Sequence, residues 1–129
     1  MSQTVFLRRV LILDAVASGA TGLSMFAFAA LLEQWLNLPA VLLRYAGLSL
    51  LPFAAIVAWL GLRASLSRAG VWAVIALNVL WVVDSAALLV SGWVDPALLG
   101  YAFVIFQAAV VAVLAELEFI GLRQLGLRL

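Results

Sequence analysis

The sequence predicts an all-α protein, a four-helix bundle that spans a membrane. Of its 129 residues, 68% are hydrophobic and 10% are charged, whereas soluble domains typically carry about 25% charged residues. The apolar runs do not alternate with polar residues and are too long for membrane β-strands of about 10 residues. Abundant alanine and leucine favour helix instead. A soluble fold of this size has too much surface for so few charges, so we expect it to lie in a bilayer.

Four stretches are long enough to cross a bilayer, since a spanning helix needs about 20 mostly apolar residues. We expect spans at 8–32, 40–62, 70–93 and 97–121, all within one domain of residues 1–129. The first span begins with two arginines and continues as an apolar run, a pattern that signal peptides share. Its apolar run continues to Leu32, however, and further spans follow, so we interpret it as a retained helix.

The connections between the spans are short. "EQWLNLP" joins the first two spans, "RASLSRAG" the next two, and "VDP" the last two. Pro39 and Pro96 stand at helix starts, where a missing N–H costs nothing, and Pro52 is expected to kink the second helix. Short links favour antiparallel neighbours, so the predicted topology is up-down-up-down.

The arginines predict the orientation of the bundle. All but one of them fall on the same side of the four spans, and Arg44 alone falls on the other. Because cytoplasmic loops carry an excess of basic residues, we expect both termini in the cytoplasm. The pairs "PAVLLRYAG" with "PALLGYAF" and "GLRASL" with "GLRQLGL" also suggest a tandem repeat of two helix pairs.

Asp84 is the most unusual residue of the third span, in the apolar stretch "NVLWVVDSAALLV". It is 16 residues beyond Arg68, about 24 Å along a helix. An aspartate at the bilayer centre costs about 2.5–3.5 kcal/mol on insertion scales. Either Arg44 pairs with it as a structural ion pair, or Asp84 takes a proton or cation in a cavity.

Other polar residues occur within the spans. Asp14 lies with Ser18 on one stripe of the first helix, which should face the bundle, and inner arginines are its expected ion-pair partners. Asn78 and Gln107 are expected near mid-bilayer, either as hydrogen bonds between helices or, with Trp81, as the lining of a binding cavity. Together with Asp84, these are the candidate substrate- or ion-binding residues.

Two further acids lie near the inner end of the fourth span. Glu116 and Glu118 stand at a level similar to that of Arg63, Arg68 and Arg123, so we expect them to form interfacial ion pairs rather than a substrate site.

Composition excludes several kinds of chemistry. The chain has no cysteine and no histidine, and all seven of its basic residues are arginine. Disulfides, thiolate metal sites, histidine-ligated haem or zinc and Schiff-base chemistry are therefore excluded. No nucleophile–base pair, phosphate loop or metal cluster appears, so we expect no enzyme, no cofactor and no nucleic-acid partner.

The stretches "LRRVLILDAVASGATGL", "LPAVLLRYAGLSLLPFAAIVAWLGLR" and "NVLWVVDSAALLVSGW" resemble a set of uncharacterised small four-helix integral membrane proteins of bacteria. That resemblance implies a fold and, together with the predicted orientation, a place in the inner membrane of a bacterium, but no function. In size and helix count the chain is also similar to small multidrug-resistance transporters and to DoxX-like proteins. The former place a glutamate in the first helix, roughly where Asp14 stands, although the surrounding residues differ.

Two functions agree with these features. The chain can be an oligomeric transporter or small-molecule and ion-binding protein that uses its intramembrane carboxylates. Alternatively, it is a non-catalytic accessory or scaffold subunit of a larger membrane complex. In either case we expect its partners to be the bilayer and copies of itself or other membrane subunits.

Overall fold

The computed structural model describes residues 2–127, and this part contains helices and no strand. The helices are α1 (Ser2–Ala27), α2 (Ala29–Leu36), α3 (Ala40–Leu62), α4 (Arg68–Val90) and α5 (Leu98–Leu127). All except the short α2 are long and apolar enough to cross a membrane. The predicted all-α fold with four long apolar helices is therefore confirmed.

The first connection is shorter than predicted, because the chain stays helical up to Leu36. We expected residues 33–39 to form it, but α2 follows α1 after a bend at Phe28, across which helical hydrogen bonds continue. The helix ends where Asn37 adopts a left-handed conformation with φ 53° and its N–H donates to the carbonyl of Glu33. Such a residue is a common helix terminus.

The last connection is longer than the predicted residues 94–96. Helix α4 ends at Val90 and α5 begins at Leu98. The chain turns at Gly92, whose φ of 79° suits glycine best. Before it, the hydroxyl of Ser91 accepts from the N–H of Trp93 at 3.1 Å. Local turn chemistry therefore ended the helix earlier than the hydropathy of this stretch predicted.

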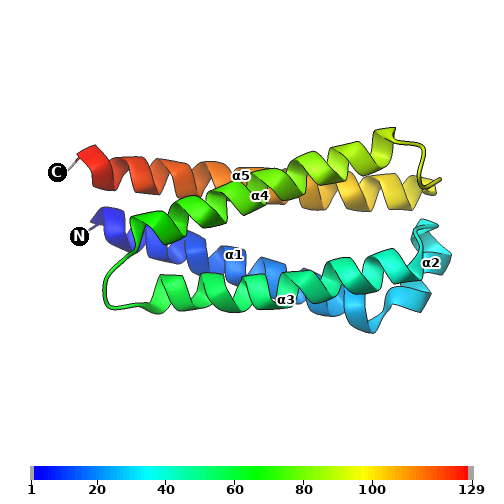
Figure 1. Ribbon diagram of the computed structural model, residues 1–129, viewed down its shortest axis with the longest axis horizontal. Helices are drawn as coiled ribbons and strands as arrows, with labels where there is room; N and C mark the ends of the chain where they lie inside the picture. Colours follow the sequence, from blue (N-terminus) through cyan, green and yellow to red (C-terminus); the bar gives the residue numbers. More distant parts are fainter. Residues whose placement is uncertain (1, 128–129) are drawn as a thin grey trace.

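The long helices form two closely packed pairs. Helix α1 packs mainly on α3 and α4 mainly on α5, α1 also contacts α5, and α3 touches α4 only sparsely. Figure 1 shows these pairs as the lower and upper halves of the bundle, with the start of α1 and the end of α5 at the same end. That the two pairs are an internal repeat stays a prediction.

Glycines let α1 and α3 approach closely. A Cβ added to Gly22 would lie 2.7 Å from the carbonyl oxygen of Gly47, and one added to Gly47 would lie 2.8 Å from the amide nitrogen of Phe26. Backbone atoms cannot move aside as a flexible side chain does. The seam between α1 and α3 therefore requires small residues, as close helix packing in membranes commonly does.

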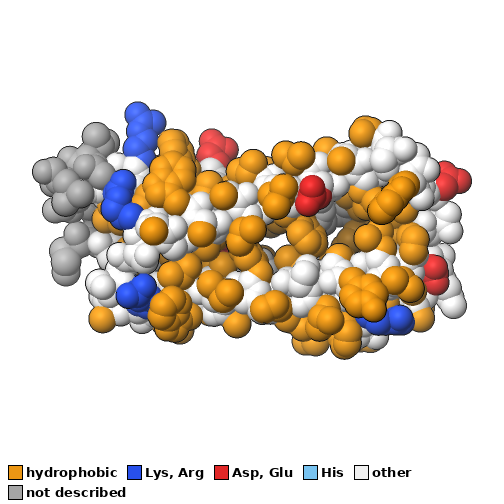
Figure 2. Space-filling model, viewed as in Figure 1, with side chains coloured by type: hydrophobic (Ala, Val, Ile, Leu, Met, Phe, Trp, Pro, Cys, Tyr) orange, Lys and Arg blue, Asp and Glu red, His pale blue; other side chains and the backbone are white. Residues whose placement is uncertain are grey.

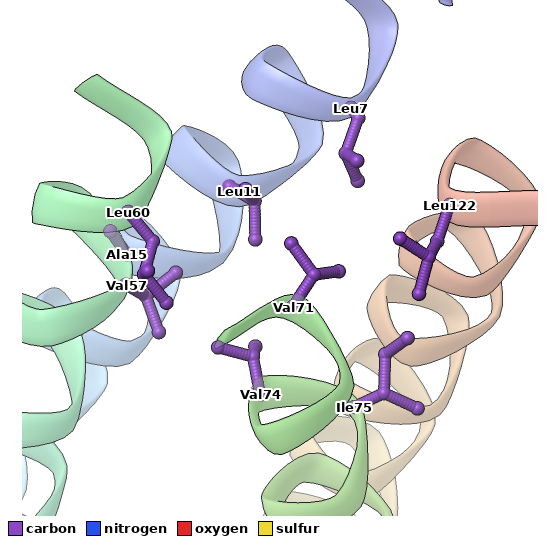
Figure 3. Packing of buried hydrophobic residues seen from close by; sticks show 9 residues of the cluster. All are labelled: Leu7, Leu11, Ala15, Val57, Leu60, Val71, Val74, Ile75 and Leu122. Carbon is purple, nitrogen blue, oxygen red and sulfur yellow. The ribbon is translucent and has the colours of Figure 1, made fainter. Parts of the chain in front are cut away.

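Apolar clusters fill the two ends of the bundle. The cluster nearest the termini takes residues from all four long helices (Figure 3): Leu7, Leu11, Ala15, Val57, Leu60, Val71, Val74, Ile75 and Leu122. The cluster at the other end consists of Met25, Ala29, Leu36, Leu38, Leu43 and Val104. Two groups of hydrogen-bonded polar side chains lie between these ends.

Candidate functional site

An inner polar cluster joins α1, α4 and α5 at the level just beyond the apolar cluster nearest the termini. Asp14, Asn78 and Glu118 form it, with Ser18 one turn along α1. Asp14 and Glu118 are completely buried, and Asn78 is 3% exposed. Burial of two carboxyl groups together is costly unless they are paired, hydrogen-bonded or neutralised.

Asn78 links the two acids. Its Nδ2 donates to Oδ2 of Asp14 at 2.7 Å and to Oε1 of Glu118 at 2.9 Å. The hydroxyl of Ser18 donates to Oδ1 of Asp14 at 3.1 Å. The other oxygen of Glu118, Oε2, is buried without a hydrogen-bond partner. Both N–H groups of one amide thus serve two carboxyl groups, and one carboxyl oxygen remains unsatisfied.

Apolar residues one turn away on each helix hold the inner cluster in place. Leu11 precedes Asp14 by three residues on α1, Ile75 precedes Asn78 by three on α4, and Leu122 follows Glu118 by four on α5. All three belong to the buried cluster nearest the termini (Figure 3). Because residues three and four apart share a helix face, the faces that form the apolar core also carry the polar groups inward.

A cavity of about 390 Å³ lies beside the inner polar cluster, toward the middle of the bundle. Ser18 belongs to both, since it lines the cavity and donates to Asp14. The rest of the wall is mainly apolar and aromatic, and its other polar side chains are Thr21, Trp81 and Gln107. Small-molecule sites typically occupy about 300–1,000 Å³ and have a few polar groups in an apolar wall.

A second cavity of about 250 Å³ is lined mainly by residues of α3, α4 and α5, and Asp84 of α4 is part of its wall. Trp81, Phe103 and Gln107 line both cavities. Figure 2 shows the face of the molecule hollowed midway along its length, between its upper and lower halves. The two cavities therefore meet at the same three side chains of α4 and α5.

An outer polar cluster separates the two cavities. Nε1 of Trp81 donates to Oε1 of Gln107 at 2.6 Å, and Nε2 of Gln107 donates to the hydroxyl of Ser85 at 3.1 Å and to the carbonyl of Val104 at 2.9 Å. The Ser85 hydroxyl donates to the carbonyl of Trp81 at 2.8 Å. Gln107 is thus held with its amide in a fixed orientation between the cavities.

The expected ion pair between Arg44 and Asp84 is not formed. Both side chains are exposed, and their helices, α3 and α4, meet only sparsely. The expectation assumed that α3 and α4, neighbours in the chain, pack on each other, whereas each packs mainly on another helix. Asp84 instead lies at the edge of the smaller cavity, where its carboxylate is accessible.

Asp14 and Glu118 also have hydrogen-bond partners other than the expected arginines. Asp14 bonds to Ser18 and Asn78, and the nearby Arg8 donates instead to the carbonyls of Gly61, Arg63 and Ala64 at the end of α3. Glu118 is not at the interface but completely buried. Of the two glutamates of α5, Glu116 is the exposed one, and it lies in a shallow groove between α4 and α5.

The role of Glu118 could have been found from its spacing. Glu116 and Glu118 are two residues apart and therefore point to different faces of a helix, so both cannot face the same neighbouring helix. Glu118 shares its face with Ala115 and Leu122, which are small or apolar. That periodicity indicates the core-facing side of α5, whereas the structure alone brings Glu118 to the level of Asp14 and Asn78.

Compared with known proteins, the chain matches no family model, no curated protein and no solved structure. The two polar clusters and the cavities are therefore the features that bear on its function. Among the described residues, no group of three or more histidine, cysteine, aspartate or glutamate side chains could hold a metal ion. The site can thus offer an apolar and aromatic surface, hydrogen bonds from fixed amide and hydroxyl groups, and carboxyl groups.

Proposed function

We propose that this chain is a small multi-pass membrane protein that binds, and as an oligomer carries, a small amphipathic molecule in its mid-bilayer cavities, using intramembrane carboxyl groups. Four helices are long and apolar enough to span a membrane. The observation that carries the proposal is the pair of cavities, which meet at Trp81, Phe103 and Gln107. Asp84 lines the smaller cavity, and Ser18, which donates to the buried Asp14, lines the larger one.

The ligand class follows from the cavity walls. The larger cavity is lined by aromatic and aliphatic side chains with Gln107, Thr21 and Ser18 as polar groups. The smaller cavity adds the carboxylate of Asp84, and neither wall includes an arginine. Aromatic faces and a carboxylate both attract cations. An organic cation with an apolar body therefore fits these walls best.

The proposed setting is the inner membrane of a bacterium with both ends of the chain in the cytoplasm. In support, basic side chains gather toward the end of the bundle that holds the termini (Figure 2). Such an excess is typical of the cytoplasmic side. A homo-oligomer is part of the proposal, because four helices alone hardly enclose a complete path across a bilayer.

Binding of radiolabelled tetraphenylphosphonium, an apolar organic cation, to the protein in nanodiscs tests the proposal, followed by its flux into proteoliposomes. Gln107→Leu removes the fixed amide between the cavities and should weaken binding about tenfold, the equivalent of one or two lost hydrogen bonds. Gln34→Leu is the matched control, since Gln34 is exposed on α2. Equal binding by wild type and Gln107→Leu would contradict the proposed site.

A scaffold role is the second candidate, and an apolar groove between α3 and α4 favours it. The groove measures about 470 Å³ and is lined mainly by Pro52, Phe53, Ile56, Trp59, Leu60, Ala73, Val74 and Leu77. Such an open apolar surface suits a partner helix. Under this alternative the chain binds no tetraphenylphosphonium, and copurification from native membranes yields a defined second membrane subunit.

A further inference from the structure

We propose that Asp14 and Glu118 bind one proton between them, beside the amide of Asn78, and that this proton exchanges with the larger cavity through Ser18. The shared proton is a property of the folded chain and does not depend on the proposed function. Only its exchange with the cavity rests on that function.

The geometry of the inner polar cluster requires a neutralising partner for the two acids. Both carboxyl groups are completely buried, and both accept from the same nitrogen of Asn78. The donors present satisfy three of the four carboxyl oxygens, and Oε2 of Glu118 has no partner. Two like charges sharing a dry site are unfavourable, and a retained proton removes one of them.

No described arginine supplies the neutralising charge. Of the charged groups around the cluster, Arg8 of α1 bonds to the end of α3, and Arg63, which directly follows α3, lies over the ring of Trp59. The others are exposed: Arg9 on α1, Arg44 on α3, Arg68 and Asp84 on α4, and Glu116 and Arg123 on α5. The acids therefore face an amide, a hydroxyl and apolar side chains.

A proton suits this site better than a metal ion does. The N–H groups of Asn78 point at the two carboxyl groups, so their positive ends occupy the place where a shared cation would sit. A metal ion would also need further oxygen ligands, whereas buried leucine, valine and isoleucine side chains adjoin the cluster. A proton needs only the free lone pair of one carboxyl oxygen, and Oε2 of Glu118 offers one.

Ser18 connects the acids to the cavity. Its hydroxyl donates to Asp14 and its side chain forms part of the cavity wall. A hydroxyl group can accept one proton and release another. It is therefore a short route by which Asp14, when it holds the shared proton, can exchange that proton with water or ligand in the cavity. The apolar cluster nearest the termini closes the other side.

Infrared spectroscopy of the protein in nanodiscs at neutral pH tests the shared proton, because a protonated carboxyl group has a carbonyl band separate from those of carboxylates. We expect a band equivalent to one protonated carboxyl group in the wild type. It should persist in Asp84→Asn and Glu116→Gln, which remove exposed acids, and disappear in Asp14→Asn/Glu118→Gln. Absence of the band in the wild type, or its persistence in the double variant, would overturn the proposal.

Two further measurements keep the test decisive if the double variant does not fold. In the wild type, ¹³C labelling of aspartate and glutamate carboxyl groups should shift the band, and exchanging potassium for sodium should leave it unchanged. Loss of the band in sodium would assign the site to that cation and overturn the proposal.

The exchange route has its own readout. Ser18→Ala should slow hydrogen–deuterium exchange of the band about fivefold, as expected for the loss of one hydrogen-bonded step. Unchanged exchange would overturn the Ser18 route. A protein that shows the band but does not bind tetraphenylphosphonium would refute the proposed function and leave the proton site standing.

Discussion

Each of the two polar clusters is built around one amide side chain, but their surroundings differ. Asp14, Asn78 and Glu118 of the inner cluster are buried within the bundle, and only the adjoining Ser18 reaches a cavity. The outer cluster of Trp81, Ser85 and Gln107 separates two cavities, with Asp84 exposed at the edge of one of them. A buried group that loses its partner has no water to replace it, whereas a group facing a cavity can bind water or ligand. We therefore expect the inner cluster to govern stability and the outer one to govern binding.

The largest expected effect comes from removing the amide that links the two acids. Asn78→Leu should lower the free energy of unfolding by about 3 kcal/mol, because two buried carboxyl groups lose a donor. Unfolding in mixed micelles with increasing denaturing detergent measures this. The triple variant Asp14→Leu/Asn78→Leu/Glu118→Leu removes all three polar groups and should recover most of the loss. A stable Asn78→Leu protein would show that the inner cluster is not sealed.

A smaller effect is expected from Gln107→Leu at the outer cluster. It removes hydrogen bonds to Trp81, Ser85 and Val104, yet cavity water can replace some of them, so we expect a loss of about 1 kcal/mol. The same unfolding experiment measures it, with Gln34→Leu as the control. A loss of unfolding free energy as large as that of Asn78→Leu would show that the two clusters contribute equally to stability.

Asp84→Asn should leave stability within about 0.5 kcal/mol of the wild type, because the side chain is exposed and surface substitutions have small effects. Its affinity for tetraphenylphosphonium should fall about fivefold through the loss of one nearby charge. Equilibrium binding in nanodiscs gives the affinity, and Glu116→Gln is the control, since Glu116 lies in a separate groove. Unchanged affinity would exclude Asp84 from the site.

The smallest effect concerns Arg44 and Asp84 together. Because no ion pair joins them in the structure, a double-mutant cycle of Arg44→Ala and Asp84→Ala should give a coupling energy below about 0.3 kcal/mol. The four proteins of the cycle are compared by detergent unfolding at low salt. A coupling near 1 kcal/mol or more would mean that α3 and α4 approach each other in the membrane, and the two cavities would then be smaller than described.

The sequence allowed some of the polar residues to be placed and not others. The stripe of Asp14 and Ser18 was correctly predicted to face the bundle, because a polar group in lipid has no partner. The pairing of Asp14 with Glu118 was missed, because hydropathy reports how apolar a helix is and not which helix it packs on. Arg44 was considered as a partner of Asp84 for the same reason: adjacent helices in the chain were taken to be adjacent in space.

Composition and the lengths of the apolar runs alone determined the four long helices, since a helix is the one open-chain conformation that satisfies all its backbone groups internally in lipid. Tertiary structure decided which helix faces meet. Close approach at Gly22 and Gly47 joins α1 to α3, and α4 is left to pack on α5. Because the helices pack in these pairs, Asp14 and Glu118, which are far apart in the chain, share the amide of Asn78. Asp84 stays exposed beside a cavity.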